Sequence, residues 1–335
     1  MLRLPPFRYV APRSLAEAAG ALAEHDSATL VAGGTDLLPN MKRRQQTPGV
    51  VVGLRAIPEL RGISRTDDGG LRLGAMASLA EVAASPIVRQ HATALATAAG
   101  LVSTPPLRAM GTIGGNLCLD TRCTYYDQNY RWRQSIDFCM KRPEDNPKAI
   151  CWVAPGSPRC WAVSSSDTAP VAVALGARLR LVSASGERFV EAAEFFRDDG
   201  IAYLTRRPDE ILADVLLPPL DGWRTVYLKL RRRDSFDFPI LGVAAAARWV
   251  EGAIADLRVV LGAVGSAPAD VSASARTFIG GPLTPEAIEA IATAAHRSAR
   301  PLDNTDLGFA WRKKMTRVYV KRALAELGGP PVERP

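Results

Sequence analysis

The sequence Ala28-Thr-Leu-Val-Ala-Gly-Gly-Thr-Asp-Leu-Leu38 predicts a strand, a turn and a helix in the N-terminal part of the chain. Residues 28–32 are mostly apolar, which is typical of a short buried strand, and a helix is expected to begin near Leu37. The glycine turn Gly33-Gly-Thr-Asp36 joins the two elements. A second apolar run, Gly49–Leu54, predicts a strand parallel to the first, so we expect a small unit in which helices pack on a sheet.

Outside this unit, capping boxes and apolar runs predict the other elements. In Ser14-Leu-Ala-Glu17 and in Ser78-Leu-Ala-Glu81, the serine hydroxyl and the glutamate carboxylate can satisfy free amides at a helix start. Strands at 60–64 and 71–76 flank the turn-rich residues 67–70, as in a hairpin. Further strands are expected at 178–183, 210–217, 225–230, 244–250 and 256–262, and further helices at 92–99, 285–298 and 309–326.

The composition indicates a globular chain with more than one subdomain. Its 335 residues exceed the usual size of a single core. The longest apolar runs, such as Ile240–Ala247, are far shorter than the ~20 residues that span a bilayer, so no membrane segment is predicted. Met1–Tyr9 lacks the apolar core of a secretory signal, and we therefore expect a cytoplasmic protein whose thiols stay reduced.

The net charge of +8 is spread along the chain. The basic clusters are modest, as at Arg231–Arg233 and at Arg312–Lys314, and no nucleic-acid-binding module is recognisable. The basic surplus is interpreted either as a solvated surface or as a docking face for an acidic protein or an anionic substrate. We expect no nucleic acid partner.

Four of the five cysteines lie in one proline-rich stretch without a helical or strand pattern: Cys123, Cys139, Cys151 and Cys160. Such a loop needs an external constraint. Four thiolates can bind an iron-sulfur cluster or a structural zinc ion, and disulfides or unliganded thiols are the remaining alternatives. Because removal of residues 121–162 would leave a continuous domain, this stretch is predicted to be an insertion.

A second glycine loop, Gly111-Thr-Ile-Gly-Gly-Asn116, repeats the chemistry of Gly33–Asp36. Glycines let a ligand approach the backbone, and free amides at a helix start can bind phosphate. Each loop alone could be a tight turn, but two loops can supply donors on both sides of a dinucleotide pyrophosphate. Neither matches the GxGxxG or Walker pattern. Beside an iron-sulfur cluster, the dinucleotide we expect is FAD, which exchanges electrons singly or in pairs.

At these residues the chain resembles the FAD-binding subunits of molybdenum hydroxylases, the xanthine dehydrogenase family. The motifs that carry the resemblance extend along nearly the whole chain: Phe7-Arg-Tyr-Val-Ala-Pro-Arg-Ser-Leu-Ala-Glu-Ala18, Val31-Ala-Gly-Gly-Thr-Asp-Leu-Leu38, Gly111–Asn116, Ser166-Asp-Thr-Ala-Pro170, Asp209-Glu-Ile-Leu212 and Tyr227-Leu-Lys-Leu-Arg-Arg232. The resemblance implies an α+β fold, with two subdomains that bind FAD and a C-terminal α+β domain that has a small antiparallel sheet and a helical bundle. The implied segments are FAD-binding subdomain 1 (1–57), FAD-binding subdomain 2 (58–217, with the insertion at about 121–162), the C-terminal flavoprotein domain (222–327) and a disordered tail (328–335).

The resemblance also implies roles for individual residues. Two loops would hold the FAD pyrophosphate through backbone amides: Leu30, Val31, Ala32, Gly33, Gly34, Thr35, Asp36 and Leu37, and Thr112, Ile113, Gly114, Gly115 and Asn116. Val102 and Leu212 would pack near the flavin ring or the adenine. Asp167 would bind a sugar or ribityl hydroxyl and Lys229 would lie beside the isoalloxazine, with surface charges as the alternative for both. Cys118 would be an unliganded, buried small residue.

Most members of this family lack a four-cysteine insertion. Its place after the TIGGN segment resembles the β subunits of 4-hydroxybenzoyl-CoA reductases, in which the cysteine quartet would bind a 4Fe-4S cluster. That branch implies a duplicated complex of three different subunits, with molybdopterin on a large partner and two 2Fe-2S clusters on a small one. Electrons from reduced ferredoxin would pass through this chain's cluster and FAD to the molybdenum, where 4-hydroxybenzoyl-CoA becomes benzoyl-CoA in anaerobic aromatic degradation.

The chemistry of that oxidoreductase belongs to the partner, so no catalytic residue is expected on this chain. One alternative is the FAD subunit of another molybdenum hydroxylase, which oxidises an aromatic compound or a purine and has an added cluster. Another is a flavin-free binding module in which the four cysteines hold structural zinc.

Overall fold

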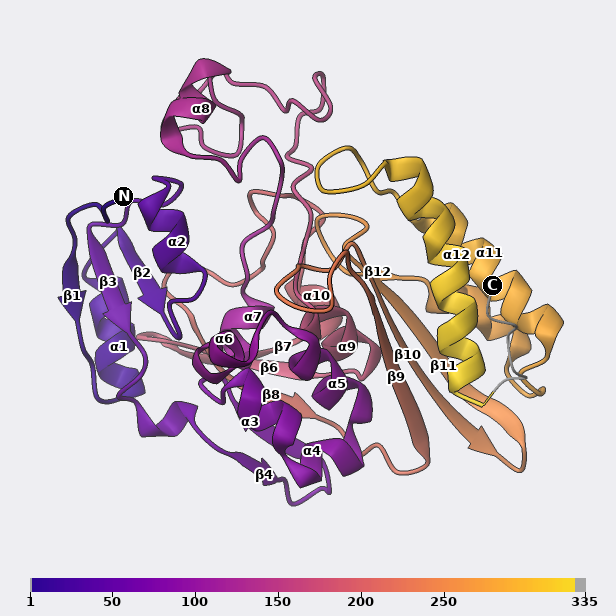
Figure 1. Cartoon of the computed structure of the whole chain (residues 1–335). Helices are drawn as coiled ribbons and strands as arrows, with labels where there is room; N and C mark the ends of the chain where they lie inside the picture. The colour runs from indigo at the N-terminus through magenta and orange to yellow at the C-terminus, as the bar shows by residue number, and fades with distance from the viewer. Residues whose placement is uncertain (1, 329–335) are drawn as a thin grey trace.

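The computed structural model describes residues 2–328, and the predicted tail lies outside the described residues except for Gly328. The architecture is α+β, as predicted, with three separate sheets. Figure 1 shows the N-terminal sheet on one side, the C-terminal sheet with its two long helices on the other, and the predicted insertion above them both. Among the described residues, no helix is long and apolar enough to cross a membrane.

The N-terminal sheet is parallel, with strand order β1-β3-β2. Its elements are β1 (Arg8–Val10), α1 (Leu15–Ala23), β2 (Ala28–Val31), α2 (Leu37–Lys42) and β3 (Val50–Gly53). The predicted parallel pair, β2 and β3, is therefore confirmed, whereas β1 had no predicted counterpart. Ser14 caps the start of α1, because its hydroxyl accepts a hydrogen bond from the Glu17 amide.

The second sheet is antiparallel, with strand order β4-β5-β8-β6-β7. Its strands are β4 (Ile63–Arg65), β5 (Leu71–Gly74), β6 (Arg178–Ser183), β7 (Gly186–Glu191) and β8 (Ile211–Leu217). The strand predicted at 60–64 begins too early, because Pro58–Leu60 forms a 3₁₀ turn, η1, with proline at its start. The helices that pack around this sheet are α3 (Leu79–Ala84), α4 (Pro86–His91), α5 (Thr93–Leu101), α6 (Pro105–Met110), α7 (Ile113–Leu117), α9 (Thr168–Ala174) and α10 (Ala192–Phe195).

The cysteine-rich stretch, residues 121–162, is called the cysteine loop from here on. One short helix interrupts it, α8 (Tyr130–Ser135), which the sequence pattern did not predict. An antiparallel bridge joins its two ends, since Arg122 and Val163 exchange backbone hydrogen bonds of 2.8 and 2.7 Å. The loop thus leaves the fold and returns to it at one point. In Figure 1 it stands above the gap between α2 and α12.

The C-terminal sheet is antiparallel, with order β12-β11-β10-β9. Its elements are β9 (Trp223–Leu230), β10 (Leu241–Val250), β11 (Ala253–Gly262), β12 (Ala269–Asp270), η2 (Ser272–Phe278), α11 (Pro285–Ser298) and α12 (Phe309–Glu326). Both faces of β10 are buried: Ala244 and Ala246 belong to the core around the second sheet, and Val243 and Ala245 to the core under α11 and α12. The small side chains let helices approach from both sides.

Candidate functional site

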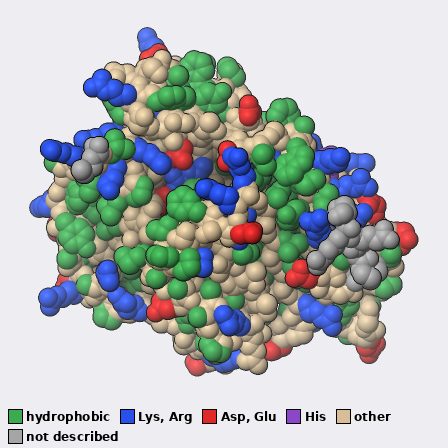
Figure 2. Space-filling view, in the orientation of Figure 1, with side chains coloured by type: hydrophobic (Ala, Val, Ile, Leu, Met, Phe, Trp, Pro, Cys, Tyr) green, Lys and Arg blue, Asp and Glu red, His purple; other side chains and the backbone are tan. Residues whose placement is uncertain are grey.

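A large cleft, with a volume of about 1030 Å³, lies where the first two sheets, the cysteine loop and the C-terminal domain meet. This volume is at the upper end of ordinary ligand pockets and suits a dinucleotide. Figure 2 shows the hollow below the cysteine loop, with basic and acidic side chains near its rim. Fourteen of the seventeen residues predicted to bind FAD line the cleft: Leu30, Ala32, Gly33, Gly34, Thr35, Asp36, Leu37, Val102, Thr112, Gly114, Gly115, Asn116, Asp167 and Leu212.

The two glycine loops meet at this cleft. A Cβ atom on Gly33 would lie 1.9 Å from the carbonyl oxygen of Met110 and 3.1 Å from the Cα of Gly111, so only glycine permits this approach. Within the described residues, the backbone amides of 33–37 donate no hydrogen bond to the protein. All five of these residues line the cleft, so their amides are the candidate donors to an anion bound there.

The second glycine loop differs, because its amides are already used. The amides of residues 113–116 donate to Ala77, Ala75 and Thr112, the last through both its hydroxyl and its carbonyl oxygen. A Cβ atom on Gly114 would lie 2.7 Å from that of Ala75, so the glycine serves close packing. This loop shapes the cleft wall, whereas the first loop offers the free donors.

Asn116 fixes the second loop to the segment around Asp167. Its side-chain oxygen accepts hydrogen bonds from the Ser166 hydroxyl (2.9 Å) and from the amide and hydroxyl of Thr168 (3.2 and 2.7 Å). A sequence motif far along the chain thus places Asp167 at the cleft.

Asp167 is buried and belongs to a polar cluster with two residues of β9. Tyr227 donates to one carboxylate oxygen (2.8 Å) and Lys229 to the other (2.9 Å), while Lys229 also donates to the Leu101 carbonyl (3.0 Å). Burial raises the pKa of Asp167, and Lys229 offsets part of that rise. Only 3% and 1% of the two side chains are exposed, which rules out the surface-charge alternative.

Three predicted residues do not line the cleft: Val31, Ile113 and Lys229. Val31 and Ile113 belong to β2 and α7, whose neighbouring residues do line the cleft, and Lys229 lies behind Asp167, which it holds in place. Cys118, expected to be buried, is only half-buried and lines the cleft.

Arg122 is a cleft residue that the sequence did not reveal. Its buried guanidinium pairs with Asp36 of the first glycine loop and, at 3.4 Å, with Asp127 of the cysteine loop. It also donates to Asn40 (3.2 Å) and lies over the ring of Phe238 (4.9 Å). This residue therefore ties the cysteine loop to the glycine turn, and its only sequence signal is its position next to Cys123.

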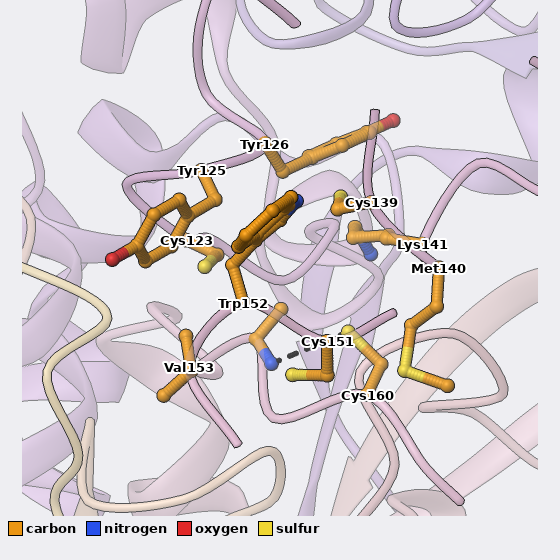
Figure 3. A pocket seen from close by; sticks show the side chains of 11 residues that line it. Cys123, Tyr125, Tyr126, Cys139, Met140, Lys141, Cys151, Trp152, Val153 and Cys160 are labelled. Atoms are coloured by element: carbon orange, nitrogen blue, oxygen red, sulfur yellow. Dashed lines mark hydrogen bonds between the residues drawn. The ribbon is translucent and has the colours of Figure 1, made fainter. Parts of the chain in front are cut away.

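Cys123, Cys139, Cys151 and Cys160 are all buried free thiols and line one small pocket, the cysteine pocket. Figure 3 shows their sulfurs around it, with Trp152 and Lys141 alongside. Burial raises the pKa of Cys123 to about 12 and that of Cys160 to about 11. Without a bound cation, the thiols of Cys123 and Cys160 therefore stay protonated.

Four thiols are the donor set that an iron-sulfur cluster or a structural zinc ion takes. Among the described residues, however, no group of three or more His, Cys, Asp or Glu is placed so that it could hold a metal ion. No pair of cysteines forms a disulfide. The free volume is about 10 Å³, room for one water molecule, so a cluster requires the lining side chains to move outward.

The chain matches two protein families that together cover most of it. Residues 5–220 match the FAD binding domain in molybdopterin dehydrogenase, and residues 225–327 match the CO dehydrogenase flavoprotein C-terminal domain. It is 26% identical to the putative xanthine dehydrogenase FAD-binding subunit of Escherichia coli K12, with 94% of this chain and 95% of that protein covered. It is 29% identical to the carbon monoxide dehydrogenase medium chain of Hydrogenophaga pseudoflava, with 96% of both covered.

Solved structures agree with this assignment. A carbon monoxide dehydrogenase chain from Hydrogenophaga pseudoflava superposes with a TM-score of 0.80 at 28% identity, covering 97% of this chain and 98% of the other. The predicted fold class and the predicted FAD-binding character are thereby confirmed. The chain belongs to the FAD-binding subunits of the xanthine dehydrogenase and carbon monoxide dehydrogenase family of molybdenum hydroxylases.

Proposed function

We propose that this subunit binds FAD in the cleft and a 4Fe-4S cluster in the cysteine pocket, and that it carries electrons between a partner's molybdenum site and an external carrier. When bound, the cluster would exchange single electrons and FAD would exchange one or two. The observation that carries the proposal is the convergence of four buried thiols on a pocket that shares Cys123 with the cleft.

For FAD, the free amides of residues 33–37 are proposed to bind the pyrophosphate, because they form the unpaired run of donors in the cleft. Thr112–Asn116 would form the opposite wall. Asp167, held by Tyr227 and Lys229, would accept a hydrogen bond from a ribityl or ribose hydroxyl. Val102 and Leu212 would pack against the ring or the adenine.

The partners follow from the relatives. Four proteins named as medium chains, medium subunits or FAD-binding subunits match 94–98% of this chain: those of a putative xanthine dehydrogenase, a nicotine 6-hydroxylase and two carbon monoxide dehydrogenases. We therefore propose a large molybdopterin subunit and a small 2Fe-2S subunit as partners, in a duplicated heterotrimer. The same names favour a hydroxylase that oxidises an aromatic compound or a purine over the reductase that the cysteine loop suggests by resemblance.

The cysteine loop favours one second candidate, the β subunit of a 4-hydroxybenzoyl-CoA reductase supplied by ferredoxin. Only this loop supports that assignment. The assembled complex separates the two candidates: a reductase converts 4-hydroxybenzoyl-CoA to benzoyl-CoA with reduced ferredoxin, whereas a hydroxylase oxidises its substrate and passes electrons outward through this subunit.

Anaerobic purification, followed by flavin, iron and sulfide analysis, tests the cofactor proposal. We expect one FAD with four iron and four sulfide per chain. Cys151→Ser should lose iron and keep FAD, because Cys151 lines only the cysteine pocket. Cys118→Ser is the matched control and should keep its iron. Wild-type protein that binds FAD but no iron, or iron content that Cys151→Ser leaves unchanged, would refute the cluster.

A further inference from the structure

Lys141 lies two residues after Cys139 and lines the cysteine pocket. Only 5% of its side chain is exposed. Its ammonium donates to the Asp120 carboxylate (2.8 Å), the Thr121 hydroxyl (2.7 Å) and the Gly200 carbonyl (2.5 Å). These three acceptors use the full donor capacity of an ammonium group, so the positive charge is fixed in one place.

Two aromatic rings hold the same ammonium from its sides. The Nζ atom is 5.1 Å from the ring centroid of Tyr126 and 5.5 Å from that of Tyr203. Tyr126 is anchored by its own hydroxyl, which donates to the Gln45 carbonyl (3.0 Å). Lys141 is therefore a built feature of the pocket and not a mobile surface cation.

Asp120, the partner of Lys141, lies on the other side of the same wall. Asp120 lines the cleft but not the cysteine pocket, and Lys141 lines the cysteine pocket but not the cleft. Cys123 lines both cavities, so the wall is one residue thick at that point. The ion pair spans this wall: the Lys141 ammonium lies on the side of the cysteine pocket, and the Asp120 carboxylate lies on the side of the cleft.

We propose that Lys141 is a positioning residue that raises the reduction potential of the cluster in the cysteine pocket, and that Asp120 moderates this effect from the cleft side. The inference rests on the proposed cluster. Reduction adds one electron, and therefore one negative charge, to a centre beside a fixed ammonium group. Nearby charge is one of the determinants of iron-sulfur potentials, and burial strengthens it here.

The test measures the cluster's midpoint potential in the full-length chain, purified anaerobically, by a redox titration followed by electron paramagnetic resonance. Lys141→Met should lower the midpoint, Asp120→Asn should raise it, and the double variant should lie between the two single variants. Lys148→Met, an exposed lysine of the same loop, is the control and should leave the midpoint unchanged. A merely structural defect would not shift the two single variants in opposite directions.

Each outcome decides a different point. If Lys141→Met keeps its iron and its midpoint equals that of the wild type, or if both single variants shift the same way, the inference is overturned while the cluster stands. If Lys141→Met loses its iron, Asp120→Asn decides, and an unchanged or lowered midpoint overturns the inference. A wild-type chain without iron overturns the proposed cluster together with the inference.

Discussion

Gly33→Ala tests the meeting of the two glycine loops. The new Cβ atom would lie 1.9 Å from the Met110 carbonyl oxygen, and ordinary contact begins near 3.4 Å, so the loops must separate by about 1.5 Å. Overpacking of this kind costs about 1–3 kcal/mol. The same movement takes at least one amide of residues 33–37 beyond hydrogen-bonding distance of a bound phosphate. One lost hydrogen bond to a charged group, about 1.5–3 kcal/mol, weakens FAD binding roughly 10- to 150-fold.

The assay is a fluorescence titration of deflavinated protein with FAD, combined with thermal unfolding. Gly20→Ala is the matched control, since a Cβ atom there meets nothing within 4 Å. Gly20 lies in α1, where alanine should stabilise the chain by about 0.5–1 kcal/mol and leave the Kd for FAD unchanged. If Gly33→Ala bound FAD as tightly as Gly20→Ala, the amides of residues 33–37 would not be the phosphate site.

Two further predictions concern the cysteine loop and pH. The Arg133 guanidinium is only 1% exposed and donates to Asp145 (2.9 Å) and to the Arg44 carbonyl (2.8 Å). Arg133→Met should therefore destabilise the cysteine loop by ~3–5 kcal/mol, because it leaves a buried charge without its partner. Limited proteolysis should cleave the loop faster in this variant than in the exposed control Arg131→Met, and equal cleavage rates would contradict the prediction. Burial raises the pKa of Glu210, but hydrogen bonds from Arg188 and from the Arg207 amide outweigh it and lower the net pKa. The contribution of the Glu210 carboxylate to folding stability is therefore complete above its unfolded pKa of about 4.5 and is lost as the pH falls through the folded pKa. The stability advantage of the wild type over Glu210→Gln should shrink below about pH 4.5. A difference in urea unfolding that does not change with pH would refute this prediction.

Most helices and strands could be predicted from the sequence, because apolar runs and capping boxes are formed by residues close together in the chain. The apolar run before Gly33 and the one at 49–54 gave the parallel pair β2 and β3. The Ser78 capping box is present with both of its hydrogen bonds. Failures occurred where the pattern was short: β1 has three residues, and the apolar residues near Leu60 enter a 3₁₀ turn before the strand begins.

Part of the candidate site could be predicted because its motifs are formed by residues close together in the sequence. Glycine and cysteine motifs are visible in sequence, and most of the predicted residues do line the cleft. Lys229 was assigned beside the flavin, yet it holds Asp167 from behind. Arg122 was missed, because its partner Asp36 is distant in sequence and an isolated arginine carries no pattern.

The family, the glycine loops and the cysteine quartet can all be recognised in the sequence alone, since each depends on residue types and their spacing along the chain. The three-dimensional structure was needed to show that Gly33 lies against Met110, that Asp167 is buried against Lys229, and that the ion pair of Asp120 and Lys141 lies between two cavities. Such contacts join segments far apart along the chain. Their geometry is set by how whole sheets and loops pack, and no local periodicity encodes it.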